Sequence, residues 1–175
     1  MAELTSRDRL QPALLDRLAD DAPQERTEPR ERRVVSTHGL RASVLRDLSD
    51  LLNAHALYGC ASMDAHPLAR ASVVNYGLRD VTGKARSSLD VAALAREIEC
   101  AIARFEPRVV AGSLRVRPID TEEAAERAAV AFLVEGDLWA QPYPERLYFR
   151  TELDLESGQA RIIDGFDSPS RAAQR

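Results

Sequence analysis

The sequence predicts an α+β fold in which an antiparallel sheet of three to four C-terminal strands is packed by N-terminal and central helices. Two observations along the chain predict it. Apolar residues recur at helical spacing up to residue 105, and they recur at every second position after residue 114. The 175 residues are enough for one domain with its own core, without disulfides or a structural metal.

A first core helix is expected just after Gly39, where the domain is expected to begin. One helical face collects six positions: Val44, Leu45, Leu48, Leu51, Leu52 and His55. We therefore expect His55 at the edge of the core. An irregular region from 57 to 88 follows, with a short helical turn expected around Leu68 to Val74. Thr82-Gly83-Lys84 is interpreted as a turn, because it is too short for a phosphate-binding loop.

The best-patterned helix of the chain is predicted to follow. Ser87 and Asp90 stand at capping-box spacing and favour a helix start there. The expected apolar face consists of Val91, Leu94, Ala95, Ile98, Ala101, Ile102 and Phe105. The polar residues Arg96, Glu97, Glu99 and Arg104 are expected to point away from it. The helix should end at Glu106, because Pro107 cannot continue it and restricts the residue before.

Three strand patterns and a hairpin turn come next. Leu114 and Val116 alternate with arginines. The run from Val130 to Val134 has apolar or small residues at every position, so we expect that strand to be covered on both faces. The run from 147 to 155 alternates cleanly, and Glu156-Ser157-Gly158-Gln159 predicts a hairpin turn into a fourth strand at 160–163.

Residues 1–38 differ from the core at 39–165 and from the tail at 166–175. Four leucines at helical spacing, Leu10, Leu14, Leu15 and Leu18, predict a short helix, and a polar linker follows it. One apolar stripe on a short helix cannot form a domain alone. This helix either docks on its own core or binds another protein, and the sequence leaves both options open.

Composition excludes several function classes. The formal net charge of −4 argues against nucleic-acid binding. Cys60 and Cys100 form no paired motif and are expected to be reduced and buried, which suits the cytoplasm. No secretory signal and no membrane-spanning run is recognised. The three histidines lack metal-ligand spacing, so we expect no metal and no cofactor.

The tripeptide Glu106-Pro107-Arg108 places an acid and an arginine at the corner between helix and strand. It could serve catalysis, hold the corner together, or bind a partner. Glycoside hydrolysis would need a second carboxylate, with Asp120, Glu135 and Glu152 as candidates. Nothing favours one pair, and 5% aromatic residues is little for a saccharide cleft. Because Glu28-Pro29-Arg30 repeats the tripeptide in the linker, the flanking helix and strand give it meaning.

Three separated motifs in order resemble one family. They are Val44 to Asn53, Ser72-Val73-Val74-Asn75-Tyr76-Gly77-Leu78, and Ala101 to Arg108. Together with Leu14-Leu15-Asp16-Arg17-Leu18, they resemble TssE, the baseplate subunit of bacterial type VI secretion systems, which is similar to the wedge protein of contractile phage baseplates. The likeness spans about residues 10–165.

The resemblance implies a structural, non-enzymatic baseplate wedge subunit, cytoplasmic and located at the membrane-docked baseplate. Its implied partners are TssF, TssG and TssK in the wedge and the sheath proteins TssB and TssC, joined through an exposed sheet edge. It assigns partner binding to Glu106, Pro107 and Arg108, and Leu14, Leu15 and Leu18 are added as docking residues. The alternatives are a lysozyme-like cell-wall glycosidase that uses Glu106, and a regulator or adaptor that reuses the fold.

Overall fold

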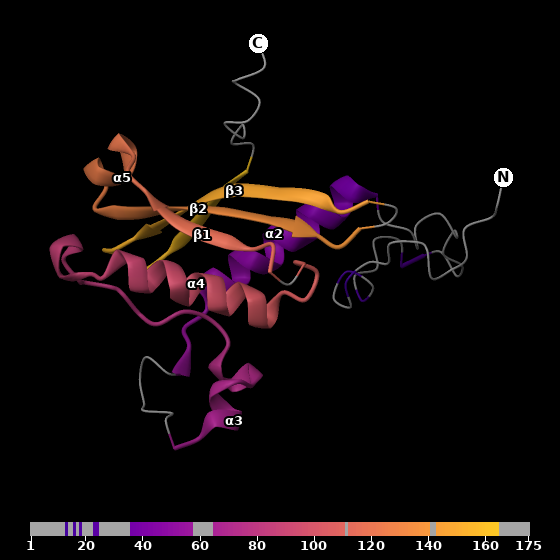
Figure 1. The fold of residues 1–175 in the computed structure, drawn as a ribbon, viewed down its shortest axis with the longest axis horizontal. Helices are drawn as coiled ribbons and strands as arrows, with labels where there is room; N and C mark the ends of the chain where they lie inside the picture. The colour runs from indigo at the N-terminus through magenta and orange to yellow at the C-terminus, as the bar shows by residue number, and fades with distance from the viewer. Residues whose placement is uncertain are drawn as a thin grey trace, which may run out of the picture.

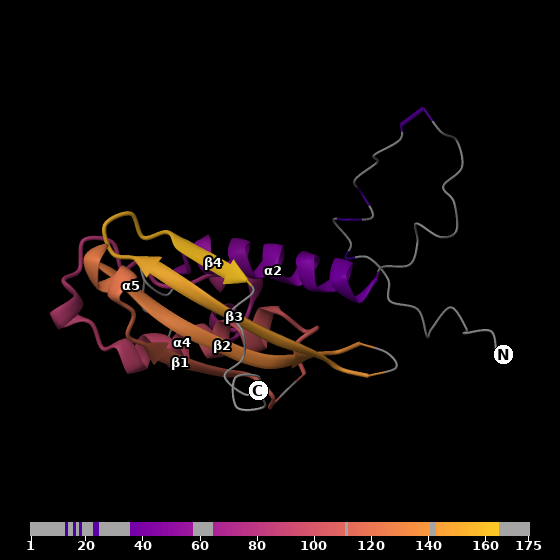
Figure 2. The ribbon, with the colours of Figure 1, turned by 90° about the horizontal axis from the view of Figure 1, so that it is seen from above.

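The chain folds as an antiparallel sheet of four strands with two long helices on one face, which confirms the predicted α+β class (Figures 1 and 2). The computed structural model describes residues 13, 16, 18, 23–24, 36–57, 65–110, 112–140 and 143–164, apart from the side chain at 125. Most of the predicted N-terminal helix and linker, Cys60 and the tail at 166–175 lie outside the described residues.

Helix α2 (Thr37–Asn53) is the predicted first helix and begins before Gly39. The Ser36 hydroxyl caps it by accepting the backbone N–H of Gly39 at 3.1 Å. Its buried face consists of Leu40, Val44, Leu48, Leu51 and Leu52. The expectation for His55 was wrong: the helix ends at Asn53, so His55 leaves the apolar face and is exposed.

The irregular region contains the short helices α3 (Pro67–Arg70), η3 (Val73–Asn75) and η4 (Arg86–Ser88), and α3 projects away from the sheet (Figure 1). The region is fastened to the end of α2, where Leu78 donates to the Ala54 carbonyl at 2.9 Å. Gly77 makes this close approach possible, because its φ is +114° and a Cβ there would lie 2.2 Å from the Ala54 oxygen. Gly83 has a φ of +74°, which confirms the predicted turn.

Helix α4 (Val91–Phe105) has the predicted apolar face but a different start. Asp90 is the cap residue and accepts the N–H of Ala93 at 2.8 Å, while Ser87 lies one element earlier in η4. Cys100 is exposed rather than buried, because it falls on the outer side of the helix. Glu99 lies off the apolar face as expected, yet it is half-buried and accepts a backbone N–H from the sheet.

The sheet has the strand order β1 (Arg115–Ile119), β2 (Ala129–Leu138), β3 (Glu145–Asp154) and β4 (Ala160–Asp164), all antiparallel. Strand β2 is buried on both faces at 129–134, as predicted. The sequence reading missed the short helix α5 (Glu122–Glu126) between β1 and β2. This helix covers the outer face through Ala124, which packs on Ala129 and Ala131.

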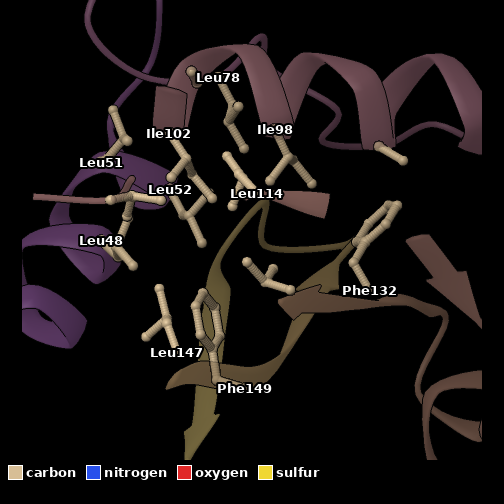
Figure 3. Close-up of a cluster of buried hydrophobic side chains, with 14 of the residues drawn as sticks. Leu48, Leu51, Leu52, Leu78, Ile98, Ile102, Leu114, Phe132, Leu147 and Phe149 are labelled. Carbon is tan, nitrogen blue, oxygen red and sulfur yellow. The ribbon is translucent and has the colours of Figure 1, made fainter. Parts of the chain in front are cut away.

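The main core lies between the two long helices and the inner face of the sheet. Figure 3 shows leucines of α2 and isoleucines of α4 facing Phe132, Leu147 and Phe149 of the sheet. Both phenylalanines are fully buried, and each supplies a large apolar surface to hold the helices on the sheet. Among the described residues, no helix is both long and apolar enough to cross a lipid bilayer.

Candidate functional site

The Glu106-Pro107-Arg108 corner directly follows α4 and lies beside the C-terminal end of β2. Glu106 ends the helix and donates its N–H to the Ile102 carbonyl at 2.9 Å. The chain then runs beside β2: Trp139 donates to the Arg108 carbonyl at 2.7 Å, and Val110 donates to the Asp137 carbonyl at 2.8 Å. Backbone hydrogen bonds therefore fix the corner on both sides.

The two charged side chains of the corner bind each other. Arg108 donates from Nε to Glu106 Oε1 at 2.7 Å and from Nη2 to Oε2 at 2.5 Å, which is the two-pronged geometry of a strong arginine–carboxylate pair. The backbone N–H of Arg108 also donates to Oε1 at 3.1 Å. The Glu106 side chain is only 4% exposed, so its charge depends on this cation for compensation.

Arg108 also reaches helix α2. Its Nη1 donates to the Ser43 hydroxyl at 3.1 Å, and its Nη2 donates to Asp47 Oδ2 at 2.5 Å. Four of the five N–H donors of an arginine are thus used within the described part of the chain. The hydrogen bonds that Arg108 donates to Glu106 raise the pKa of Arg108, and burial opposes that shift. The corner is therefore a brace that ties α4, α2 and β2 together.

The hydrogen-bonded network continues from Asp47 to Arg46 and from Arg46 to Asp16, so acidic and basic side chains alternate along it. Arg46 donates to Asp47 Oδ1 from Nε at 3.1 Å and from Nη2 at 2.9 Å. Arg46 also pairs with Asp16, with 2.6 Å between Nη1 and Oδ1. The hydrogen bond that Asp16 accepts from Arg46 lowers the pKa of Asp16, against a smaller opposing effect of burial. The same contact raises the pKa of Arg46.

A cavity of about 330 Å³ lies beside the corner. It is lined by Ala13, Asp47, Leu48, Leu51, Tyr76, Phe105, Glu106, Pro107 and Arg108. Tyr76 packs edge-on against Phe105, with 5.2 Å between the ring centroids. Burial raises the pKa of Tyr76, and the nearby carboxylates Asp50 and Asp47 add to the shift. The cavity therefore combines apolar walls with a charged rim and a neutral phenol.

This arrangement does not suit the glycosidase alternative. A general acid must reach the glycosidic oxygen, but Glu106 is buried and both of its carboxylate oxygens bind Arg108. Glu135 and Glu152 stand on the outer face of the sheet, and Asp120 is paired with Arg86 at 2.7 Å. Within the described ranges, no cluster of three or more potential metal ligands is present.

The structure brings together only part of the predicted site. Glu106, Pro107 and Arg108 form one corner, whereas Leu18 is 73% exposed, and Leu14 and Leu15 lie outside the described residues. The sequence reading missed Ser43 and Asp47. The available signal was their spacing of four residues on α2, which puts both on one edge of that helix.

Comparison with known proteins identifies the family. The family model described as baseplate wedge protein gp25 matches residues 38–143, from the start of α2 past the end of β2, and so includes the whole corner. No curated protein and no solved structure matches the chain. The chain therefore belongs to the baseplate wedge protein gp25 family, a family of structural baseplate proteins.

Proposed function

We propose that this protein is the TssE-like wedge subunit of a type VI secretion baseplate and links the wedge to the contractile sheath. TssF, TssG and TssK are its proposed wedge partners, and TssB and TssC its proposed sheath partners. The observation that carries the proposal is the Arg108 brace, which falls inside the matched family region and is built for rigidity rather than for chemistry.

The brace supports partner binding by fixing the shape of the corner. Pro107 is exposed, and Arg108 keeps one Nη1 donor that no described residue uses. A partner backbone carbonyl at this donor, with an apolar side chain in the neighbouring cavity, would meet a surface already in its bound shape. Such preorganisation lowers the entropic cost of assembly.

The sheet edge at β1 is closed to an added strand. Val116 donates its outward N–H to Glu99 Oε2 at 3.1 Å. Backbone groups of alternate residues face the same edge, so the next outward position is Pro118, which has no N–H. An incoming strand would find two successive donors missing there. Strand addition by the sheath proteins is therefore proposed for the opposite edge.

At the opposite edge, formed by β4, some of the outward backbone groups are already hydrogen-bonded. Asn53 donates to the Ala160 carbonyl at 3.0 Å and accepts the Ala160 N–H at 2.9 Å. Two residues further along β4, the outward groups of Ile162 have no hydrogen-bond partner among the described residues. Beyond β4, Arg41 covers the β3 carbonyls of residues 146 and 148, both at 2.9 Å. Ile162 is thus the point at which a sheath strand can begin to pair.

The wedge half of the proposal is tested by co-expressing the chain with TssF and TssG and isolating the complex. We expect the wild type to co-purify with them. The Arg108→Ala variant should co-purify far less, and the control variant Arg117→Ala, whose arginine is exposed on β1, should behave as the wild type. Unchanged recovery of the Arg108→Ala variant would overturn the corner assignment, and no complex with the wild type would overturn the wedge role.

The sheath half is tested with Ile162→Pro, which removes one outward N–H from β4. We expect this variant to remain in the wedge complex but to recruit less TssB–TssC than the wild type. Arg161→Ala, a change on the outer face of the same strand, is the matched control. Equal recruitment by Ile162→Pro would exclude this edge. A muralytic assay of wild type and Glu106→Gln tests the glycosidase alternative, which requires hydrolysis that the variant loses.

A further inference from the structure

We infer that the N-terminal segment docks on its own core: Asp16 latches it onto α2, and Ala13 forms one wall of the cavity beside the corner. The sequence left open whether this segment docks on its own core or on another protein. The contacts of Ala13 and Asp16 favour docking in cis, and they need no assumption about the baseplate partners.

The latch consists of two polar contacts to α2. Asp16 Oδ1 lies 2.6 Å from Arg46 Nη1, and Asp16 Oδ2 accepts the Ser43 hydroxyl at 2.9 Å. Both carboxylate oxygens are therefore engaged, one by a cation and one by a neutral donor. Leu18 is 73% exposed, so in the described part of the segment the acid, rather than this leucine, makes the contact with the core.

Ser43 connects the latch to the brace. A serine hydroxyl has one hydrogen to donate and two lone pairs to accept with. The hydrogen goes to Asp16, and the lone pairs accept from Arg108 Nη1 at 3.1 Å and from Arg46 Nη2 at 3.4 Å. All of its hydrogen-bonding capacity is thus divided among the segment, the corner and Arg46 of its own helix.

Asp47 is the second shared side chain. Its Oδ1 accepts from Arg46, which holds the latch, and its Oδ2 accepts from Arg108, which forms the brace. In such a network each hydrogen bond polarises the next, so a change at one end alters the other. Opening the latch should therefore loosen Arg108.

Hydrogen exchange of the full-length chain tests the latch. Asp16→Arg and Arg46→Asp should each raise amide exchange in peptides that cover residues 13–18 on the order of tenfold, and the double variant should restore protection because the charges are swapped. Asp50→Asn, which removes an acid of α2 outside the network, is the matched control. Unchanged exchange in Asp16→Arg, or no recovery in the double variant, would overturn the latch.

The coupling needs its own readout, because a latch could exist without it. In Asp16→Arg, exchange should also rise in the 106–110 segment, whereas the global unfolding midpoint should stay close to that of the wild type. A synthetic peptide of residues 10–21 should bind the Asp16→Arg protein and reverse both changes, while the wild type, whose own Asp16 occupies Ser43 and Arg46, should bind it at least about tenfold more weakly. Equal binding to both proteins, or exchange at 106–110 that does not respond, would overturn the coupling.

Discussion

Two arginine–glutamate pairs of this protein have the same chemistry and different environments. Arg108 and Glu106 meet at 2.5 Å with side chains 23% and 4% exposed. Arg117 and Glu135 meet at 2.8 Å across β1 and β2, with side chains 57% and 24% exposed. The first pair joins three elements, whereas the second joins neighbouring strands that are already hydrogen-bonded.

We expect burial and connectivity, rather than distance, to decide how much each of these ion pairs contributes to stability. Water screens the charges of an exposed pair. When one partner is removed, water hydrates the charge that remains. A buried carboxylate has no such replacement, so removal of its cation leaves an uncompensated charge. The corner pair should therefore dominate stability, and the strand pair should contribute little.

The largest effect is expected for Arg108→Met. This change keeps much of the side-chain volume but removes the cation from Glu106 and Asp47, and it should lower the free energy of unfolding by about 3 kcal/mol. Urea unfolding at pH 7, followed by circular dichroism, measures it. A loss no larger than that of an exposed-pair variant would contradict the comparison.

A double-mutant cycle sharpens the comparison further. Because Glu106→Gln removes the orphaned charge, the double variant Glu106→Gln/Arg108→Met should be more stable than the sum of the single losses predicts, with a coupling of about 1–3 kcal/mol. The same cycle with Glu135→Gln and Arg117→Met should give roughly 0.5 kcal/mol or less. Equal coupling energies in the two cycles would show that burial makes no difference.

An intermediate effect, on the docking of the N-terminal segment, is expected from Asp16 at the outer end of the network. Its pKa is lowered in the folded chain from the ordinary value of 3.8, so its contribution to the docking of the N-terminal segment is complete above that value and is lost as the pH falls through the lowered pKa. Hydrogen exchange of residues 13–18 should therefore increase, relative to that of the core, at acid pH. In Asp16→Asn this acid dependence should be absent, and a variant that keeps it would point to another titrating group.

The smallest effect is expected for Arg117→Ala. Exposed pairs contribute about 0–1 kcal/mol, so the change in unfolding free energy should stay within roughly 0.5 kcal/mol and shrink further in about 1 M salt. Urea unfolding at low and high salt measures both values. A loss that approaches that of Arg108→Met would mean that the outer face of the sheet carries more of the stability than its exposure implies.

The fold could be read from the sequence where local signals agree with burial. Helices α2 and α4 follow from apolar residues on one helical face, and β2 follows from an uninterrupted apolar run. The prediction of the α4 start was wrong, because two local signals competed there. Ser87 and Asp90 are both good cap residues, and Asp90 prevails because η4 already includes Ser87.

The candidate site could be read in part. Pro107 fixes the helix end at Glu106 through purely local sterics, so the corner and its charged pair were predictable. The partners Ser43 and Asp47 were not, since they precede Arg108 by 65 and 61 positions and only the packing of α2 beside α4 brings them together. The same applies to Glu99 on the β1 edge, because helical periodicity cannot show which strand lies beside a polar residue.

The sequence by itself determined the fold class, the two long helices, the hairpin turn and the position of a charged corner. Each of these depends on sterics or periodicity within a few residues. Only the tertiary structure decided that Arg108 braces α2, that Asp16 joins the same network, and that β1 offers a closed edge. These features depend on distances between segments far apart in the chain, and those distances are fixed when the apolar faces of α2, α4 and the sheet are buried together.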